Sequence, residues 1–297
     1  MNILLATDGS EYSELAARFL RRFRWSRDDN ITVFHALYWI PFRYDEEFYL
    51  STLKDLKKEL APRVLDSIVK ILKPLAANIG VAIQEGAPEK CIIDAAVNSD
   101  EDMIVLGARG IKGAESFFVG SVTRSVANDS PKPVLVVKPR VNTASDTMRV
   151  LFAADGSDHS YATGEFLSEI PFPDDTEVTI LHVIWSNVLD IPVRFAMEAD
   201  ERTKEFMTAT SEMEFAKSER ITEQAAEHFN RRFKKVHILS KVGDPSAEIL
   251  STAETIGADV IAMGCRGLRG IKKIMGSVSR NILIHSKSCV LIGKACE

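Results

Sequence analysis

A glycine-rich segment between an apolar run and a predicted helix is the part of this chain best suited to hold a phosphate group. Gly107-Ala-Arg-Gly110 follows the apolar residues 103–106, and nine residues then separate Gly110 from Gly120-Ser121. A helix is expected to begin at Ser121, and the unpaired N–H groups and dipole of a helix N-terminus favour an anion. Glycines let the main chain approach oxygen atoms and adopt φ above zero. The spacing therefore predicts a phosphate-binding loop.

Three polar residues near this loop could contribute to a site. Asp8 follows the first apolar run and is expected to cap the next helix, or to face a sugar hydroxyl, an adenine amine or a bound Mg²⁺, or to do both. Arg109 lies within the loop with no acidic neighbour in sequence, so it either contacts phosphate or is simply exposed. His35 ends a second apolar run and is expected to be packed or hydrogen-bonded in the core.

The chain repeats almost all of these features in its second half, as a domain-length repeat does. The spacing between copies shows that the second copy has ten extra residues between His182 and Gly243 and lacks one residue inside its glycine loop. That shortening is expected to displace Gly276 or to re-route residues 271–275. The matching features are Asp155 for Asp8, His182 for His35, Gly264-Cys-Arg-Gly267 for the first loop, and Gly276-Ser277 for Gly120-Ser121.

Short apolar runs rich in branched residues alternate with amphipathic stretches in each half, which predicts a parallel sheet with helices on both faces. The expected fold class is α/β with two repeated, doubly wound domains of five strands each, residues 1–141 and 147–297, joined by a polar linker at 142–146. In the second copy the extra residues are expected to lengthen a helical region from Val188 to Phe233, with Pro192 near its start. In the first copy strands are predicted at 3–6, 31–34, 81–83, 103–106 and 134–137, and helices at 11–22, about 45–79, 88–98 and 121–129.

Composition excludes several classes of protein. The chain has 297 residues, 45% of them hydrophobic, and a formal net charge of −5. No basic stripe suggests nucleic acid, no apolar run reaches the roughly 20 residues of a membrane span, and the first residues lack a signal-peptide pattern, so we expect a cytoplasmic protein. The four cysteines lack metal-ligand spacing and are interpreted as three core or loop residues, Cys91, Cys265 and Cys289, and one tail thiol, Cys296.

These motifs resemble those of the universal stress protein family. The resemblance rests on Gly-x2-Gly-x9-Gly-Ser, on Lys132-Pro-Val-Leu-Val-Val-Lys138 after it, and on Ala-Thr-Asp8-Gly-Ser before it. It covers nearly all of both halves, so the chain resembles a tandem form with two such domains. The resemblance implies sheets with strand order 3-2-1-4-5, and it implies ATP binding where the full glycine pattern is present.

Carried onto this chain, the resemblance also implies a set of site residues and an ATP ligand that Mg²⁺ could accompany. In the first half Ala6, Thr7 and Asp8 would line the adenosine, the backbone of Ala36 would meet the adenine, and Gly107, Arg109, Gly110, Gly120, Ser121, Val122 and Thr123 would wrap the ribose and phosphates. In the second half the counterparts are Ala153, Ala154, Asp155, Val183, Gly264, Arg266, Gly267, Gly276, Ser277, Val278 and Ser279. The shorter second loop predicts weaker binding there.

Three functions remain open from the sequence. The first is a stress-response protein in which ATP is a regulatory ligand. The second is an enzyme, but the chain lacks the Ser-Gly-Gly-x-Asp-Ser, His-x-Gly-His and Gly-x4-Gly-Lys-Ser/Thr motifs of related ATP-using folds, so catalysis beyond slow ATP hydrolysis is not expected. The third is a nucleotide-free structural or interaction protein. An unidentified protein partner fits any of them.

The last strand of each copy predicts how the halves assemble. Residues 134–137 and 290–292 would lie at sheet edges in the 3-2-1-4-5 order, and an uncovered apolar edge strand invites aggregation. We expect the two edges to cover each other within one chain, giving a pseudo-twofold two-domain monomer that could form a homodimer.

Overall fold

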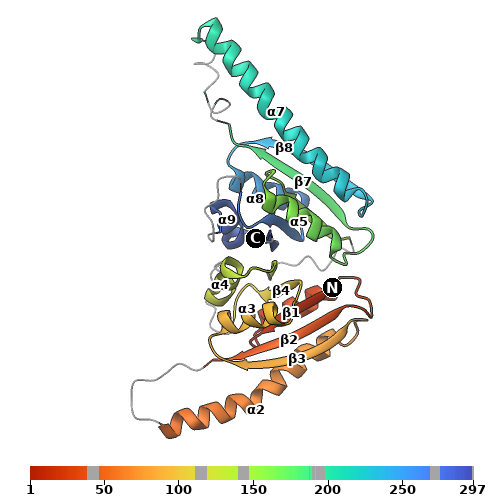
Figure 1. The fold of residues 1–297 in the computed structure, drawn as a ribbon, viewed down its shortest axis with the longest axis vertical. Helices are drawn as coiled ribbons and strands as arrows, with labels where there is room; N and C mark the ends of the chain where they lie inside the picture. The colour runs from red at the N-terminus through yellow and green to blue at the C-terminus, as the bar shows by residue number, and fades with distance from the viewer. Residues whose placement is uncertain are drawn as a thin grey trace.

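The computed structural model describes residues 1–38, 47–110, 119–139, 147–186, 188, 191, 198–267 and 275–295, with the side chains of residues 47–53 left out. Each half is an α/β unit (Figure 1). The first half contains β1 (Asn2–Thr7), α1 (Glu11–Leu20), β2 (Asn30–Leu37), α2 (Glu47–Leu72), β3 (Asn78–Glu85), α3 (Pro88–Asn98), β4 (Met103–Gly107), α4 (Ser121–Asp129) and β5 (Val134–Val137). The second half contains β6 (Arg149–Ala153), α5 (Asp158–Glu169), β7 (Glu177–Ile184), α7 (Glu201–Phe229), β8 (Lys235–Val242), α8 (Pro245–Ile256), β9 (Val260–Gly264), α9 (Ser277–His285) and β10 (Cys289–Gly293).

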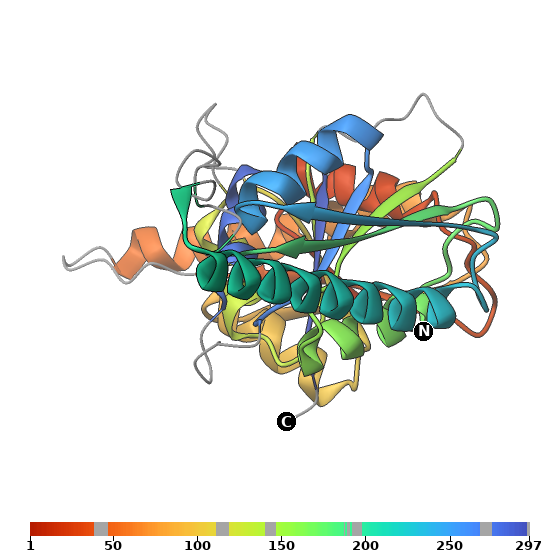
Figure 2. The same cartoon turned by 90° about the horizontal axis from the view of Figure 1, so that it is seen from above.

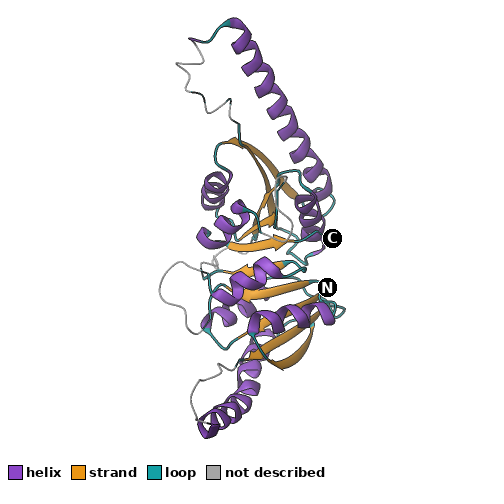
Figure 3. Ribbon diagram, turned by 60° about the vertical axis from the view of Figure 1, so that its left-hand side comes forward, coloured by secondary structure: helices purple, strands orange, loops and turns teal. Residues whose placement is uncertain are grey.

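The ten strands found among the described residues form one sheet, in the order β3-β2-β1-β4-β5-β10-β9-β6-β7-β8. Within each half the strands are parallel and follow the expected 3-2-1-4-5 order, and helices lie on both faces (Figure 2, Figure 3). Strands β3 and β8 form the two edges of the sheet. The predicted fold class is therefore confirmed.

One expected helix boundary is wrong by several residues. The helix expected at about 45–79 ends at Leu72, and residues 78–80 belong to β3, because the amphipathic pattern continues across the short turn between the two elements. In the second copy the described helix α7 begins at Glu201, where Asp200 accepts a hydrogen bond from the Thr203 amide as its N-cap, and most of the expected helical region before it lies outside the described residues. The linker at 142–146 and Pro192 lie outside the described residues, and the domain limits stay a prediction.

The two halves meet through their last strands, as expected from the edge argument. Strand β10 pairs with β5 in antiparallel fashion, with Leu291 opposite Leu135, Val290 opposite Val136 and Ile292 opposite Val134. Because Leu291 is also the counterpart of Leu135 in the repeat, the pairing is symmetric about these two leucines. The seam is thus a local pseudo-twofold axis.

The buried apolar residues form two clusters, and each cluster contains residues of both halves. One cluster of buried apolar residues lies on the α1, α2, α5 and α7 side of the sheet and contains both Phe19 and Phe152. The other lies on the α3, α4, α8 and α9 side and contains both Ile92 and Ile249. Across the seam the rings of Phe23 and Phe172 have centroids 5.2 Å apart, so the turn after α1 packs on the second half.

The seam also contains one buried ion pair and two reciprocal lysine contacts. Arg22 Nη1 lies 2.7 Å from Asp259 Oδ1, a carboxylate with only 3% of its side chain exposed. Lys138 Nζ donates to the carbonyl of Leu283 at the end of α9 (2.8 Å), and Lys294 Nζ donates to the carbonyl of Ala127 in α4 (2.9 Å). The two lysine contacts join each half to a helix of the other half.

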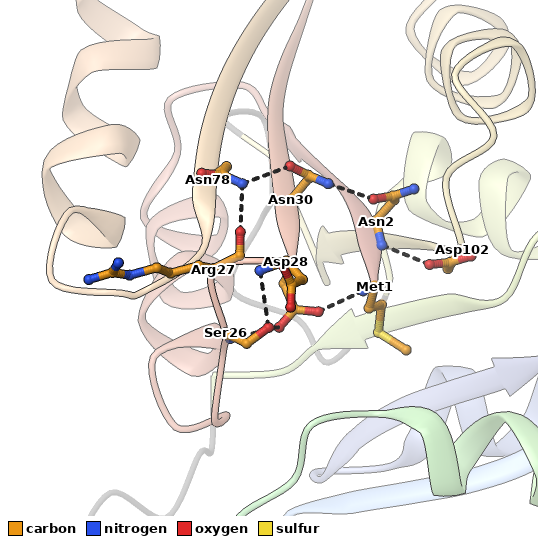
Figure 4. A network of polar contacts seen from close by, with 9 residues as sticks. Met1, Asn2, Ser26, Arg27, Asp28, Asn30, Asn78 and Asp102 are labelled. Atoms are coloured by element: carbon orange, nitrogen blue, oxygen red, sulfur yellow. Dashed lines mark hydrogen bonds and ion pairs between the residues drawn. The ribbon is translucent and has the colours of Figure 1, made fainter.

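Aligned polar residues hold the strands together at their amino ends, the end of the sheet away from the predicted site. Asn2, Asn30 and Asn78 stand at matched register positions of β1, β2 and β3, and their side chains form a ladder at 2.8 and 3.2 Å (Figure 4). The second half replaces this ladder with charges, since Glu177 accepts from Lys235 at 2.6 Å and from Arg149 at 3.4 Å. Both ladders resist slippage of register.

The contribution of Lys138 to stability is expected to rise at alkaline pH. Burial lowers the pKa of Lys138 from 10.5 to about 8, so between these values the unfolded chain holds a proton that the folded chain has released. Stability rises with pH wherever the unfolded state binds more protons, here by roughly 3 kcal/mol over the whole window. The free energy of unfolding of Lys138→Met, measured with urea, should not show this rise with pH, whereas that of the unsubstituted protein should. Parallel pH curves for the two proteins would contradict the expectation.

Candidate functional site

The predicted first-half residues surround one cavity at the carboxyl ends of β1, β2 and β4. The cavity has a volume of about 850 Å³ and is closed on its sides by α2 and by the first turns of α3 and α4. This is the position where open α/β sheets bind ligands. The residues of the prediction that line it are Ala6, Thr7, Asp8, Ala36, Gly107, Arg109, Gly110, Gly120, Ser121, Val122 and Thr123.

Helix α4 presents an uncapped N-terminus to this cavity. Its N-cap is Gly120, which has no side chain to accept a hydrogen bond from the first-turn amides, and Ser121, Val122 and Thr123 line the cavity. Gly120 N donates to the Ala108 carbonyl at 2.8 Å, and Thr123 Oγ1 donates to the Gly107 carbonyl at 2.9 Å. Both bonds fix the helix start against the end of β4. The arrangement is a positioned set of amide donors with the positive end of a helix dipole behind it.

The three loop glycines have different physical roles, and none of them has a φ above zero, contrary to the sequence expectation. A Cβ on Gly107 would stand 2.6 Å from the backbone of Tyr12, so this glycine lets β4 approach α1. A Cβ on Gly110 would collide with the Asp8 carboxylate. A Cβ on Gly120 would make only ordinary van der Waals contacts, the nearest at 3.5 Å from Arg109 Cα, so of the three positions only this one has room for a side chain. Gly9 and Gly156, which follow the first strand of each half, are left-handed, with φ of 79° and 75°.

Asp8 is not the N-cap of α1, which corrects one of its two expected roles. Ser10 is the cap and accepts from the Ser13 amide, while Asp8 Oδ1 accepts from Ser10 N at 3.0 Å. Asp8 Oδ2 lies against Gly110 at the cavity wall. The carboxylate is therefore held by the turn and borders the cavity, where it can accept hydrogen bonds from a ligand hydroxyl or amine.

Arg109 is partly buried rather than fully exposed. Its guanidinium carbon lies 5.6 Å from the Tyr12 ring centroid, and Nη1 donates to the Tyr12 hydroxyl at 3.3 Å. The side chain therefore rests on α1 at the rim of the cavity. A cation at this place favours an anionic ligand.

The two histidines have the structural role that the sequence suggested. His35 Nδ1 is 2.7 Å from the Thr7 carbonyl, and His182 Nδ1 is 2.7 Å from the Ala154 carbonyl. Because a carbonyl can only accept, Nδ1 carries the proton in both. Burial lowers the pKa of His182, which keeps that ring neutral.

Sequence reasoning missed the cavity wall formed by α2. Lys57, Leu60, Ala61 and Val64 line the cavity, and Lys57 Nζ donates to the Tyr38 carbonyl at 2.9 Å. Their i, i+3, i+4, i+7 spacing is that of one helix face, a signal that indicates burial but not a ligand. The apolar residues Phe34 and Ile92 and the carboxylate Glu89 also belong to the lining.

The glycine loop of the second half has the same ends as the first. Gly276 has φ −60° and ψ 155°, against −60° and 156° for Gly120, and Gly276 N donates to the Cys265 carbonyl at 2.8 Å. Ser279 Oγ donates to the Gly264 carbonyl at 2.8 Å, as Thr123 does to Gly107. The missing residue therefore does not displace Gly276. Residues 268–274, which include most of the segment expected to re-route, lie outside the described residues.

The two halves differ in side chains instead. Val64 packs on Gly9 and Ile221 packs on Gly156, which aligns α2 with α7 and places Glu214 at the position of Lys57. Glu214 Oε2 is buried and has no hydrogen-bond partner among the described residues. Ala154 also lacks the hydroxyl of Thr7, and His159 replaces Tyr12. By this alignment a carboxylate stands in α7 where α2 of the first half has an ammonium group.

The second-half counterparts are placed as the repeat predicts. Two cavities of about 1280 and 270 Å³ lie along α7, and neither is lined by the second glycine loop. Ala153 ends β6, and Ala154 and Asp155 follow it. Val183 is in β7, Gly264 ends β9, and Arg266 and Gly267 follow it. Gly276 is the N-cap of α9, and Ser277, Val278 and Ser279 form its first turn.

The described residues add limits on metals, cysteines and membranes. Within them no three His, Cys, Asp or Glu side chains form a metal-binding group. Cys91, Cys265 and Cys289 are buried, as expected, and burial raises the pKa of Cys289 to about 12; Cys296 lies outside the described residues. The helices described here are each too short or too polar to span a bilayer.

Comparison with known proteins agrees with this architecture. The chain is 31% identical over 141 residues to a universal stress protein of Thermus aquaticus, covering 46% of this chain and 97% of the relative. It is 24% identical over 300 residues to a universal stress protein of Mycolicibacterium smegmatis, covering 98% and 96%. A solved universal stress protein of Archaeoglobus fulgidus shares the fold, with a TM-score of 0.64, 24% identity and coverage of 99% and 98%. The universal stress protein family model matches residues 1–138 and again 147–294, so the chain belongs to that family, in a tandem two-domain form.

Proposed function

We propose that this protein binds ATP as a regulatory ligand in its first-half cavity. The observation that carries the proposal is the uncapped N-terminus of α4, which faces a cavity of about 850 Å³ together with Asp8 and Arg109. Small-molecule sites commonly have volumes of about 300 to 1,000 Å³ and combine apolar walls with a few placed polar groups. The phosphates would accept hydrogen bonds from the α4 amides, and the Asp8 carboxylate would accept a hydrogen bond from a ribose hydroxyl.

The end of β2 supports an adenine contact at Ala36. Pairing of β2 with β1 ends at His35 opposite Thr7, so the β1 side of Ala36 has no strand neighbour. The Leu37 carbonyl accepts from Gly86 N on the β3 side, and consecutive strand residues direct their backbone groups to opposite edges. The backbone groups of Ala36 therefore face the cavity side. They can pair with an adenine ring packed between apolar side chains.

The first half is proposed to hold ATP more tightly than the second, for a reason of charge. Lys57 lines the first cavity, whereas Glu214 occupies the matching position in the second half. A buried carboxylate near a polyphosphate costs free energy that an ammonium does not. The shorter second loop, which first suggested the asymmetry, keeps Gly276 in place and so contributes less to the argument.

The small molecule released by denaturing the purified full-length protein tests the proposal. Mass spectrometry should detect an adenine nucleotide at close to one per chain, and calorimetry on the stripped protein should show ATP binding again. ADP in the released material would support the slow ATPase alternative. No nucleotide in the eluate and no heat on titration with millimolar ATP would favour the nucleotide-free interaction protein. The homodimer, the protein partner and the cytoplasmic location stay predictions.

A further inference from the structure

Helix α4 connects the proposed phosphate site to the second half of the chain. Its first turn lines the first-half cavity, and its last residues lie at the seam between halves. The helix has nine residues, Ser121–Asp129, and a rise of about 1.5 Å per residue makes it about 13 Å long. A group that binds one end of α4 is therefore close enough to affect the other.

Lys294 is the group that binds the C-terminal end. Its Nζ donates to the carbonyls of Ala127 at 2.9 Å and Asn128 at 3.3 Å, which a helix end leaves without partners. The Asn128 side chain in turn accepts from Met275 N, at 3.3 Å, in the second glycine loop. Both contacts come from the second half. The C-terminus of α4 is thus capped by a cation and a loop that the first half alone does not possess.

A cation at this end favours an anion at the other. The negative pole of the helix dipole lies at the C-terminal carbonyls, and a positive charge there offsets it. The electrostatic potential at the N-terminal amides, where a phosphate would bind, is then more positive. The contacts at the C-terminal end also fix the position of the helix along its axis. Lys138 makes the same contact with α9, which shows that the arrangement is repeated by the pseudo-twofold axis.

We propose that Lys294 is a positioning residue of the first-half nucleotide site, acting on α4 from the second half. This inference rests on the proposed function, because it assumes that a phosphate binds at the α4 N-terminus. It makes the tandem arrangement part of the binding site. The second half then contributes to ATP affinity even if its own glycine loop holds no nucleotide.

Calorimetric titration of the full chain with ATP, comparing three variants, tests the inference. Lys294→Met should weaken ATP binding roughly 5-fold, because the C-terminal charge is lost, and Lys294→Arg should restore most of it. Arg22→Met is the matched control: it removes another interdomain contact, with Asp259, at a place that does not touch α4. It should lower the melting temperature and leave the ATP affinity unchanged.

The pH dependence of ATP affinity distinguishes this role of Lys294 from a purely structural one. Burial lowers the pKa of Lys294; Cys265 of the second loop and Asp129 of α4 act to raise it, and Arg266 acts to lower it. Above about pH 7.5 the phosphates are fully ionised, so ATP affinity should fall as Lys294 loses its proton. Burial lowers the pKa of Lys138 as well, to about 8, so the diagnostic result is that Lys294→Arg removes most of the fall.

The outcomes separate the two claims. If the unsubstituted protein binds no ATP, the proposed function fails, and the inference with it. If it binds ATP but Lys294→Met and Arg22→Met change the affinity alike, Lys294 acts only through the stability of the seam and the inference is overturned. The same holds if the pH profile of Lys294→Arg matches that of the unsubstituted protein, a result that remains readable even if Lys294→Met does not fold.

Discussion

Gly120→Val is expected to weaken ATP binding at least about 100-fold while leaving the fold intact, since displacements near 1 Å are enough to spoil a site of this kind. The glycine has φ −60° and ψ 156°, a conformation that valine adopts without strain. A Cβ there makes only ordinary van der Waals contacts, the nearest at 3.5 Å, so valine fits the fold, and its branched side chain would narrow the cavity that Gly120 lines. The free energy of unfolding should change by no more than about 1 kcal/mol.

Gly276→Val is the matched control in the second half. Gly276 has the same backbone conformation, and its Cβ would likewise stand no closer than 3.5 Å to a neighbour. Its effect on the tighter ATP site, measured by calorimetry, should be small. If Gly276→Val removes the tighter site and Gly120→Val leaves it, the assignment of the tighter site to the first half is reversed. Loss of folded structure in Gly120→Val would contradict the conclusion that position 120 has room for a side chain.

Much of the fold could be predicted from the sequence because its elements carry local signals. The helices at 88–98 and 121–129 begin and end where predicted, since each starts beside a proline or glycine and ends before a polar turn. The end of α2 could not be predicted in this way. The apolar spacing of α2 continues into the first residues of β3, and tertiary pairing with β2 decides where the helix stops.

The candidate site was predicted less completely than the fold. The glycine spacing identified the loop, but the reason for glycine differs at each position and depends on the folded packing. Gly107 lies against α1, Gly110 lies against Asp8, and Gly120 has room for a side chain. The α2 wall carries the ordinary periodicity of a buried helix face. Lys294 gave no signal as part of the site, because its contact with α4 depends on the antiparallel register of β5 and β10.

Gly107→Ala is expected to lower the free energy of unfolding by about 3 kcal/mol, because overpacking against a rigid neighbour has this magnitude. The added Cβ would stand 2.6 Å from both the carbonyl carbon and the oxygen of Tyr12, and backbone atoms inside α1 cannot rotate away. Helix α1 would have to move, and with it the Tyr12 ring that supports Arg109. ATP affinity should therefore fall along with stability, unlike in Gly120→Val.

Two further glycines make this a graded test by urea unfolding. Gly264→Ala brings a Cβ to 2.9 Å from the His159 backbone, a milder collision that should cost less, and Gly80→Ala meets only Thr32 Oγ1 at 4.0 Å and should cost nothing measurable. Gly80 lies in an edge strand, where alanine removes backbone freedom from the unfolded chain without a steric penalty. The expected order of destabilisation is thus Gly107, then Gly264, then Gly80. Equal losses at Gly107 and Gly80 would show that α1 can move away from β4 at little cost, and the close approach of these two elements would then not be what requires glycine at position 107.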